Sequence, residues 1–139
     1  MINSKSKTIA IVPIEFIHQA WEKCKEFLEP AFDHAHGDYS IDMAKTYLSQ
    51  EKHKLILFLE NETIVGATIF SINISPTANT FYIQATGGKT TKEHMDKMFE
   101  YAKTLGATKV KACCRESVAR LCRQRYKFKE IYTMIERNL

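Results

Sequence analysis

The sequence predicts a single α/β domain in which helices cover both faces of a mixed, mostly antiparallel central sheet. Three β-rich runs follow one another between residues 55 and 85 with short turns between them, which is typical of an antiparallel meander. Helical segments then separate the later strands, and a strand reached through a helix pairs in parallel. The 139 residues contain no repeat or linker-like stretch, so we expect one domain over residues 1–139.

The first third of the chain is predicted to contain a strand and two helices. Residues 8–12 form a short strand, and an amphipathic helix runs from residue 13 to about residue 29, where Pro30 ends it. Its apolar stripe has helical spacing and consists of Ile17, Ala20, Trp21, Cys24, Phe27 and Leu28. A loop over residues 31–39 leads to a second helix that Ser40 can cap.

The remaining elements alternate between strands and helices. A tight hairpin turn is expected at Glu60-Asn61-Glu62. Thr90 and Glu93 fit a capping box at the start of the third helix, which Gly106 ends. The predicted strands cover residues 55–59, 63–74, 80–85, 108–113 and 129–135, and the last helix covers residues 116–125.

Composition indicates an intracellular setting. The chain is 45% hydrophobic and 26% charged, as in ordinary globular proteins. No apolar run approaches the roughly 20 residues that span a membrane, and Pro13 and Glu15 interrupt the first apolar stretch. We therefore expect a cytoplasmic protein without a membrane partner. The cysteines lack C-x-x-C spacing and are expected to be buried, reduced thiols: Cys24, Cys113, Cys114 and Cys122.

Positive charge is concentrated near the C-terminal end. Residues 109–130 contain eight basic and two acidic residues, a net charge of +6 (8 − 2) within a chain of net +4. Nucleic-acid-binding domains usually combine such charge with reading aromatics, for which Tyr126 and Phe128 are the candidates here. We expect a solvated surface that helps to bind an anion, and a nucleic-acid partner is disfavoured.

The segment Ala85-Thr86-Gly87-Gly88-Lys89-Thr90 lies between the third run and the third helix. A glycine pair lets a backbone approach a ligand closely, and a helix start offers unpaired amides to a phosphate. Lys89 opposes the helix dipole unless an anion is bound. The alternative is a glycine-rich turn that only precedes a capped helix, because a short glycine turn has low specificity.

The order of elements over residues 8–138 resembles that of the GNAT superfamily of acyl-CoA N-acyltransferases. Two local features carry the resemblance: the glycine turn, and Ala119-Arg120-Leu121-Cys122 followed by Phe128, which is similar to the helix-then-aromatic signature of many members. Within the superfamily the chain looks most like divergent GNAT-like proteins of tailed bacteriophages. That likeness rests on Gly37-Asp38-Tyr39 before the second helix and Leu105-Gly106-Ala107 before a strand.

The resemblance implies transfer of an acetyl group from acetyl-CoA to an amine by direct attack. In the family, acetyl-CoA lies where the fourth and fifth strands splay apart; the fourth strand holds the pantetheine and the amides after it bind the pyrophosphate. Gln84 and Gly87 match the first two fixed positions of the motif Q/R-x-x-G-x-G/A, and Lys89 occupies the last. The implied acetyl-CoA-binding residues are Ile83, Gln84, Ala85, Gly87, Gly88, Lys89, Thr90 and Thr91.

The resemblance does not assign the catalytic residues. The tyrosine that protonates the leaving thiolate in the family would fall near Cys122 or Arg123, so Cys122 is a candidate acid. His34 and His36 are candidate bases in a loop that lines the acceptor site of the family, although that loop could equally be a solvated surface. Two histidines without a third ligand are a poor metal site, and we expect no metal. Further candidate bases are Asp33, Asp38, Glu60 and Gln84.

The sequence leaves enzyme activity open. One hypothesis is an active N-acetyltransferase that uses acetyl-CoA and an amine acceptor. The other is a catalytically inactive GNAT-fold protein, a binding or virion-associated phage protein that acts through protein contacts in the host cytoplasm or the virion. A third class, a nucleic-acid accessory protein, would depend on Arg120, Arg123 and Arg125. A second copy of the chain is a further candidate partner, in a homodimer.

Overall fold

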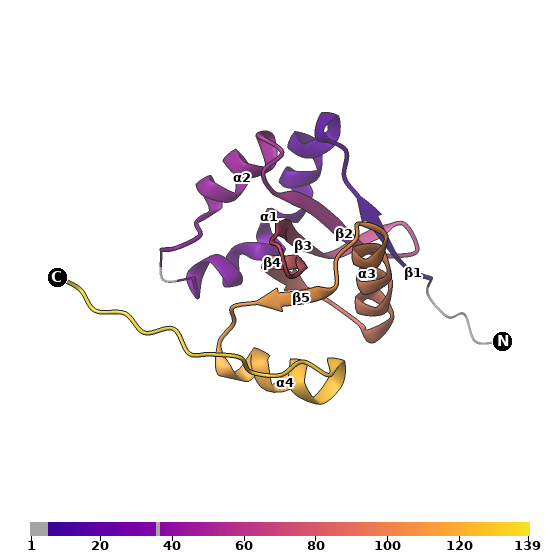
Figure 1. The fold of residues 1–139 in the computed structure, drawn as a ribbon. Coiled ribbons are helices and arrows are strands. Elements are labelled where there is room, and N and C mark those ends of the chain that lie inside the picture. The colour runs from indigo at the N-terminus through magenta and orange to yellow at the C-terminus, as the bar shows by residue number, and fades with distance from the viewer. Residues whose placement is uncertain (1–5, 36) are drawn as a thin grey trace.

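The computed structural model describes residues 6–35 and 37–139 (Figure 1). One sheet runs through the molecule, and the helices lie against its two faces. The elements in chain order are β1 (Lys7–Ile11), η1 (Ile14–Phe16), α1 (Ile17–Asp33), α2 (Ile41–Ser49), β2 (Lys54–Glu60), β3 (Thr63–Ile74), β4 (Asn79–Gly88), α3 (Lys92–Thr104), β5 (Lys109–Ala112) and α4 (Glu116–Tyr126).

The sheet has the strand order β1-β2-β3-β4-β5. Neighbouring strands are antiparallel except β4 and β5, which α3 connects and which pair in parallel. The apolar residues of α1 and α2 pack on one face, whereas α3 and Tyr126 of α4 pack on the other. The predicted mixed, mostly antiparallel sheet with helices on both faces is therefore confirmed.

Two apolar clusters hold these layers together. On the α1 face, Trp21, Leu28 and Leu48 are buried against β2, β3 and β4. On the α3 face, Phe70 and Phe81 stack with ring centroids 4.3 Å apart beneath Met98. Burying side chains of this size on both faces of a sheet is the main source of stability in such a fold.

Helix α1 continues through Pro30, so the prediction that Pro30 ends it is wrong. A proline inside a helix removes one hydrogen bond and costs about 3 kcal/mol. The last turn is held by packing, because the ring of Phe32 lies 6.3 Å from that of Trp21 and 5.9 Å from that of Tyr39. In the described part of the chain, no helix is long and apolar enough to cross a membrane.

Strand β4 extends to Gly88, so the glycine pair lies within the strand and not in a turn after residue 85. A Cβ atom at Gly87 would lie 1.7 Å from the carbonyl oxygen of Phe27 on α1. At Gly88, which has a φ of +79°, it would lie 2.5 Å from the carbonyl oxygen of Val65. These two glycines let α1 and β3 approach the backbone of β4 closely.

The start of α2 and the end of α3 agree with the sequence prediction, whereas the start of α3 does not. Ser40 accepts a hydrogen bond from the amide of Met43, and Gly106 has a φ of +84° after the end of α3, both as predicted. The N-cap of α3 is Thr91, one residue later than predicted. Its capping-box partner is His94 in place of Glu93, because His94 Nδ1 accepts from the Thr91 amide at 3.3 Å.

The predicted strand over residues 129–135 is wrong, because the chain after α4 is an extended tail that pairs with no strand in the described part of the chain. Its first residues lie along α4, where Arg123 Nη1 is 3.7 Å from Glu130 Oε1. The ring of Phe128 lies 6.0 Å from that of Phe99 on α3. These contacts carry the tail past α4 instead of along β5 (Figure 1).

Candidate active site at the splay of β4 and β5

The strands β4 and β5 separate after a short stretch of pairing. Thr80 to Ile83 of β4 pair with Lys109 to Ala112 of β5, and β5 then ends. β4 continues to Gly88, and over residues 84–88 its strand neighbour among the described residues is β3 alone. An unpaired strand edge presents amide and carbonyl groups that an extended ligand can pair with.

A β-bulge lies at the point of separation. Phe70 of β3 pairs with Ile83, and Ile69 pairs with Ala85, so Gln84 has no register partner on β3. It also lies one residue beyond the last pair with β5. A bulge leaves the extra residue outside the ladder and is frequent next to active sites. Gln84, which the resemblance placed in the acetyl-CoA site, is thus the residue at which the sheet opens.

Tyr82 and Cys113 meet beside this opening. The Tyr82 hydroxyl donates a hydrogen bond to Cys113 Sγ at 3.0 Å, across the parallel pair of strands. Burial raises the pKa of the Tyr82 phenol above its ordinary value of 10.0, so the phenol carries its proton at neutral pH. Gln84 Nε2 donates a hydrogen bond to Ser71 Oγ at 3.0 Å, and Ser71 is the residue of β3 that pairs with Tyr82. This bond holds the Gln84 side chain beside Tyr82.

The sequence analysis did not single out Tyr82. A signal was available, because Tyr82 stands between Phe81 and Ile83 in an apolar strand. Alternation places Phe81 and Ile83 on the α3 face and Tyr82 on the opposite face. Locating its hydroxyl beside the splay required the register of β4 against β5, which the sequence does not reveal.

The start of α3 lies directly after the open edge of β4. The hydroxyl oxygen of Thr90 is buried and has no hydrogen-bond partner among the described residues. Lys89 Nζ is 2.5 Å from Glu60 Oε1, and the Lys89 amide donates to the Val65 carbonyl at 2.7 Å. A buried hydroxyl without a partner is costly, and a ligand oxygen is one way to satisfy it.

Three of the candidate bases in the first loop, Asp33, His34 and Asp38, can be placed, and His36 lies outside the described residues. His34 follows α1, and its Nε2 accepts a hydrogen bond from Arg115 Nη1 at 3.0 Å, next to the start of α4. That lone pair is engaged, so taking a proton there requires the Arg115 contact to open. Asp33 and Asp38 are exposed, while the candidate base Glu60 is buried at the end of β2 and pairs with Lys89.

Cys122 lies on α4 and is half-buried. Burial raises the pKa of the Cys122 thiol above its ordinary value, which keeps it protonated at neutral pH. Of the four cysteines Cys24 is buried, whereas Cys113 and Cys114 are exposed, so the expectation of four buried thiols is wrong. β5 ends before these two cysteines, which therefore have no strand position.

The basic surface is partly neutralised by its own acidic residues. Arg123 Nη2 lies 2.7 Å from Glu116 Oε1, and Arg123 also approaches Glu130. Arg120 and Arg125 are exposed on the same helix. Since Arg123 already has two carboxylate partners, the positive charge available for an anion comes from the other arginines of α4.

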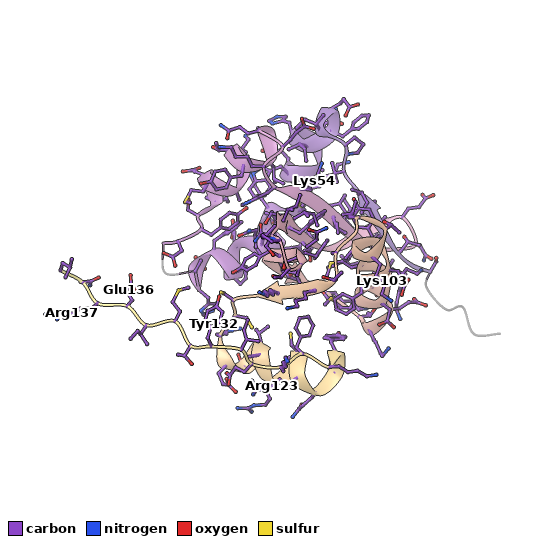
Figure 2. The ribbon with its side chains drawn as sticks, in the orientation of Figure 1. Lys54, Lys103, Arg123, Tyr132, Glu136 and Arg137 are labelled. Carbon is purple, nitrogen blue, oxygen red and sulfur yellow. The ribbon has the colours of Figure 1, made fainter. Side chains whose placement is uncertain are left out.

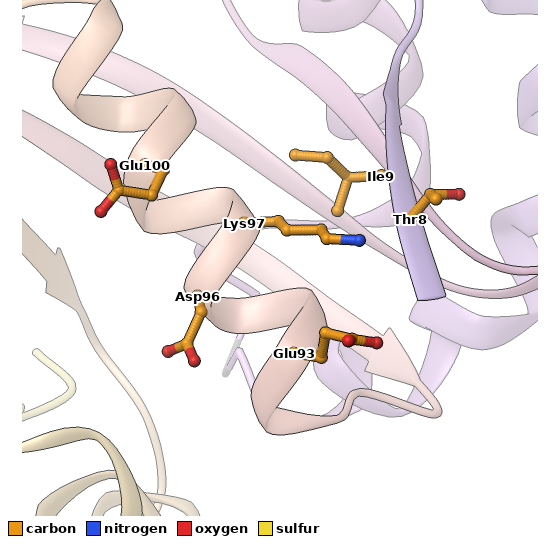
Figure 3. A pocket seen from close by; sticks show the side chains of 6 residues that line it. All are labelled: Thr8, Ile9, Glu93, Asp96, Lys97 and Glu100. Atoms are coloured by element: carbon orange, nitrogen blue, oxygen red, sulfur yellow. The ribbon is translucent and has the colours of Figure 1, made fainter. Parts of the chain in front are cut away.

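A separate groove of about 510 Å³ lies between β1 and α3, at the sheet edge opposite to β5 (Figure 3). Lys97 crosses it and donates a hydrogen bond to the Lys7 carbonyl. Its remaining lining is Thr8, Ile9, Glu93, Asp96 and Glu100. Of the predicted site residues that the structure describes, none lines this groove.

Comparison with known proteins supports the fold. No family model matches the chain, and no curated protein matches it either. Solved structures of acetyltransferases do match, over 96% of the chain. One is an aminoglycoside acetyltransferase from an uncultured soil metagenomic sample, determined with sisomicin, at 13% identity, a TM-score of 0.70 and 96% of its own chain covered.

Two other matches come from named bacteria. A predicted acetyltransferase from Clostridium acetobutylicum, determined with acetyl-CoA, has 14% identity, a TM-score of 0.63 and 96% of its chain covered. A ribosomal-protein-alanine N-acetyltransferase from Brucella melitensis biovar Abortus 2308 has 13% identity, a TM-score of 0.68 and 99% of its chain covered. The chain therefore has the fold of the GNAT acetyltransferases, and identities this low establish the fold alone.

Proposed function

We propose that the protein is an acyl-CoA N-acyltransferase that moves an acetyl group from acetyl-CoA to an amine. The observation that carries the proposal is the bulge at Gln84, placed where β5 leaves β4 and the edge of β4 opens. The same fold occurs in a protein determined with acetyl-CoA. An open, bulged strand edge followed by a helix start offers sites for an extended, amide-bearing arm and for the phosphates next to it.

The residues of this edge fit acetyl-CoA in two ways. The backbone of residues 84–88 can pair with the pantetheine arm as an added strand, because no strand covers that edge among the described residues. The buried hydroxyl of Thr90 can donate to a pyrophosphate oxygen at the start of α3. The glycine pair is already in contact with α1 and β3, so the phosphate contacts fall to the groups from Lys89 onward.

The chemistry needs a proton donor for the leaving group, and Tyr82 is placed for that role. The amine nitrogen attacks the thioester carbonyl carbon, the carbon–sulfur bond breaks, and the CoA thiolate takes the Tyr82 proton. The amine proton leaves through water, from which the Tyr82 phenolate is reprotonated. Because Tyr82 is protonated at neutral pH and lies beside the point where the strands part, it fits this position better than Cys122 on α4.

The acceptor is proposed only as a class. Two of the matching structures are acetyltransferases for amines, one for aminoglycosides and one for the alanine of a ribosomal protein. The loop after α1 and the start of α4 meet at the exposed His34–Arg115 contact. An amine, from a small molecule or a protein, is the acceptor that this chemistry requires.

Binding of acetyl-CoA is tested by calorimetry and by thermal unfolding with Thr90→Val. A ligand at 100 times its Kd stabilises the native protein by about 2.7 kcal/mol, so the wild type should melt at a higher temperature with saturating acetyl-CoA. Thr90→Val should weaken binding about 10-fold, because a hydrogen bond to a charged group contributes about 1.5–3 kcal/mol. Its unliganded melting temperature should stay the same or rise, since a buried hydroxyl without a partner is removed.

The matched control is Thr46→Val, an exposed threonine on α2, which should leave binding unchanged. Absence of any heat or melting shift with millimolar acetyl-CoA would refute the proposed function. Turnover is tested separately with an amine panel. Tyr82→Phe should lower kcat about 100-fold with little change in acetyl-CoA affinity, while Tyr101→Phe, which lies against Phe70 on the other face, should not.

A protein with this fold that binds but does not catalyse is the second candidate. It is favoured because groups that would serve acetyl-CoA already make contacts within the protein. α1 covers Gly87, Lys89 forms an ion pair with Glu60, and the Tyr82 hydroxyl is hydrogen-bonded to Cys113. Acetyl-CoA binding without turnover of any amine would support it. The likeness to phage proteins and a location in the host cytoplasm or the virion stay predictions from the sequence.

A further inference from the structure

We propose that the amine acceptor carries a carboxylate and that Arg115 binds this carboxylate, with His34 as the positioning residue that holds the guanidinium. This assignment rests on the proposed transfer of an acetyl group to an amine, and it names the acceptor as a small amino acid. Three observations support it. Arg115 lies at the boundary of the opening between β4 and β5, it has no acidic partner among the described residues, and a second basic side chain fixes it.

Three contacts between distant parts of the chain enclose the opening on the α1 face of the sheet. The first joins β4 to α1, where the backbone of Gly87 lies against the helix. The second joins β4 to the segment after β5, from the Tyr82 hydroxyl to Cys113. The third joins that segment to the end of α1, from Arg115 to His34. Each of the three parts therefore contacts the other two, and Arg115 lies on the boundary that they form.

The position of His34 follows from the length of α1. The helix continues through Pro30, and His34 is its C-cap residue. At 1.5 Å of rise per residue, His34 lies about 10 Å further along the axis than Phe27, which covers Gly87. A helix that ended at Pro30 would leave this boundary open on the side of α1.

Arg115 is close enough to the reacting atoms for one small molecule to reach both. The Tyr82 hydroxyl, which is the proposed proton donor to the leaving thiolate, lies 3.0 Å from Cys113 Sγ. Cys113 and Arg115 are separated by one residue, so their Cα atoms are at most about 7 Å apart. An amine at the thioester and a carboxylate at Arg115 can therefore belong to one short amino acid.

The described part of the chain does not neutralise the charge of Arg115. Its side chain is exposed, and its hydrogen bond to His34 is the one that it makes among the described residues. The neighbouring Glu116 pairs with Arg123, which also approaches Glu130. A guanidinium with unused donors at the edge of an opening is suited to bind an anion.

The contact with His34 leaves the carboxylate-binding side of Arg115 free. A guanidinium only donates hydrogen bonds, so His34 Nε2 accepts this one at 3.0 Å and the imidazole is neutral. The donor is Nη1, and Nε and Nη2 remain as a pair of parallel N–H groups. A carboxylate binds such a pair with two hydrogen bonds. His34 thus orders the arginine before the acceptor binds, which lowers the entropy cost of binding.

A carboxylate suits this position better than a phosphate. The imidazole is neutral, so Arg115 supplies the one positive charge of the contact. Asp33, next to His34, is exposed and adds a negative charge nearby. A group with a single negative charge and two coplanar oxygens matches one planar guanidinium.

The first experiment compares ω-amino acids of increasing length with their own primary amides as acceptors of acetyl-CoA. At the best length, kcat/KM for the acid should exceed that for the amide about 10-fold or more, the ratio expected for a charge-assisted pair of hydrogen bonds. Arg115→Gln should bring this ratio to about one by raising KM for the acid. A ratio near one in the wild type, a ratio that Arg115→Gln does not change, or a preference for aminoalkyl phosphates would overturn the proposal.

The matched control is Arg137→Gln, the same substitution at an exposed arginine that Figure 2 shows away from the body of the molecule. It should keep the wild-type ratio. A loss of preference in Arg137→Gln equal to that in Arg115→Gln would show a general effect of net charge and contradict a local site.

Two substitutions of His34 test its positioning role. Glutamine offers an oxygen that can accept from Arg115 Nη1, so His34→Gln should keep most of the preference for acids. His34→Leu should raise KM for the acids several-fold and leave KM for the amides unchanged. An equal effect of His34→Leu on acids and amides would contradict positioning through Arg115.

Binding is measured without turnover by NMR of the histidine rings. A millimolar ω-amino acid should shift the ring C–H signals of His34, which are identified by their loss in His34→Gln, and the matching amide should not. The exposed His18 on α1 is the internal control. Absence of the shift overturns the proposal whether or not an amine is acetylated. A shift without acetylation of any amine supports the carboxylate site and refutes the proposed transfer.

Discussion

The part of the chain up to the end of α3 and the part that follows it are built differently. Every buried residue of the described chain lies at or before Ala102. From Leu105 onward, through β5, α4 and the tail, none is buried. The first part has two apolar clusters against a four-stranded antiparallel sheet, and the second is a short parallel strand and an amphipathic helix docked at its edge.

The difference indicates that the buried apolar contacts of the first part stabilise the fold, whereas the second part contributes exposed side chains. Local unfolding starts in regions with few buried apolar contacts, so β5 and α4 are expected to open before the rest. The candidate active site lies on the border, with Gln84 and Thr90 on the rigid side and Cys113 on the other. An opening that can widen without disturbing the core is suited to admitting a ligand.

The largest effect is expected at Gly87, where α1 touches β4. A methyl group there would lie 1.7 Å from the Phe27 carbonyl oxygen, so Gly87→Ala should lower the free energy of unfolding by more than about 4 kcal/mol or prevent folding. Urea denaturation followed by circular dichroism measures it. Gly106→Ala is the control: Gly106 has a positive φ, unlike Gly87, but a Cβ there would lie 3.9 Å from its nearest neighbour, so a loss of about 1–2 kcal/mol is expected.

The next effect compares one apolar truncation in each part. Met98→Ala, on the buried side of α3, should cost about 3 kcal/mol in unfolding free energy because it leaves a cavity under Phe81. Leu121→Ala on α4, where the side chain is 45% exposed, should cost less than about 0.5 kcal/mol in the monomer. Similar losses for the two variants would show that α4 belongs to the core.

A smaller effect separates the two helix starts. Thr91→Ala removes the N-cap of α3 and should cost about 1 kcal/mol, as typical cap losses do. The N-cap position of α4, Arg115, makes no side-chain cap hydrogen bond, so Arg115→Ala should change the stability of that helix little. Hydrogen exchange of the amides of α3 and α4 would measure both effects. Equal losses of protection in the two variants would contradict the conclusion that Thr91 caps its helix and Arg115 does not.

The smallest effect is a dependence on pH in the first part. Burial lowers the pKa of His53 below its ordinary value of 6.5, and its Nδ1 shares a hydrogen bond with the Tyr39 hydroxyl at 2.9 Å. The unfolded chain therefore takes the proton first, and stability falls as the pH drops through about 6.5 toward the lower native value. His53→Asn should flatten the change between pH 7.5 and 5, whereas the exposed His18→Asn should not.

The sequence predicted most of the fold because the relevant signals are local. Ser40 and Gly106 mark helix ends by side-chain and backbone chemistry that acts within a few residues. The errors lie where distant contacts decide. Pro30 stays in α1 because Phe32 packs on Trp21 and Tyr39, and Gly87 lies in β4 because Phe27 of α1 covers it.

The candidate site was predictable only in outline. The segment from Gln84 to Thr91 is continuous in the chain, so a resemblance to a family could locate it. The hydrogen bond between Tyr82 and Cys113 joins residues 31 apart in sequence and depends on the parallel register. The Thr90 hydroxyl, which has no hydrogen-bond partner within the described structure, is likewise buried by other elements, and no pattern in a single sequence corresponds to that.

The contact of α1 with Gly87 has a consequence for observing the site. Trp21 is the one tryptophan of the chain and lies buried on α1, less than two turns before the carbonyl that rests on β4. A ligand that pairs with the open edge of β4 binds to a strand against which α1 packs closely at Gly87. The indole emission of the unlabelled protein should then report occupancy of the edge, which gives a spectroscopic titration without any engineered probe.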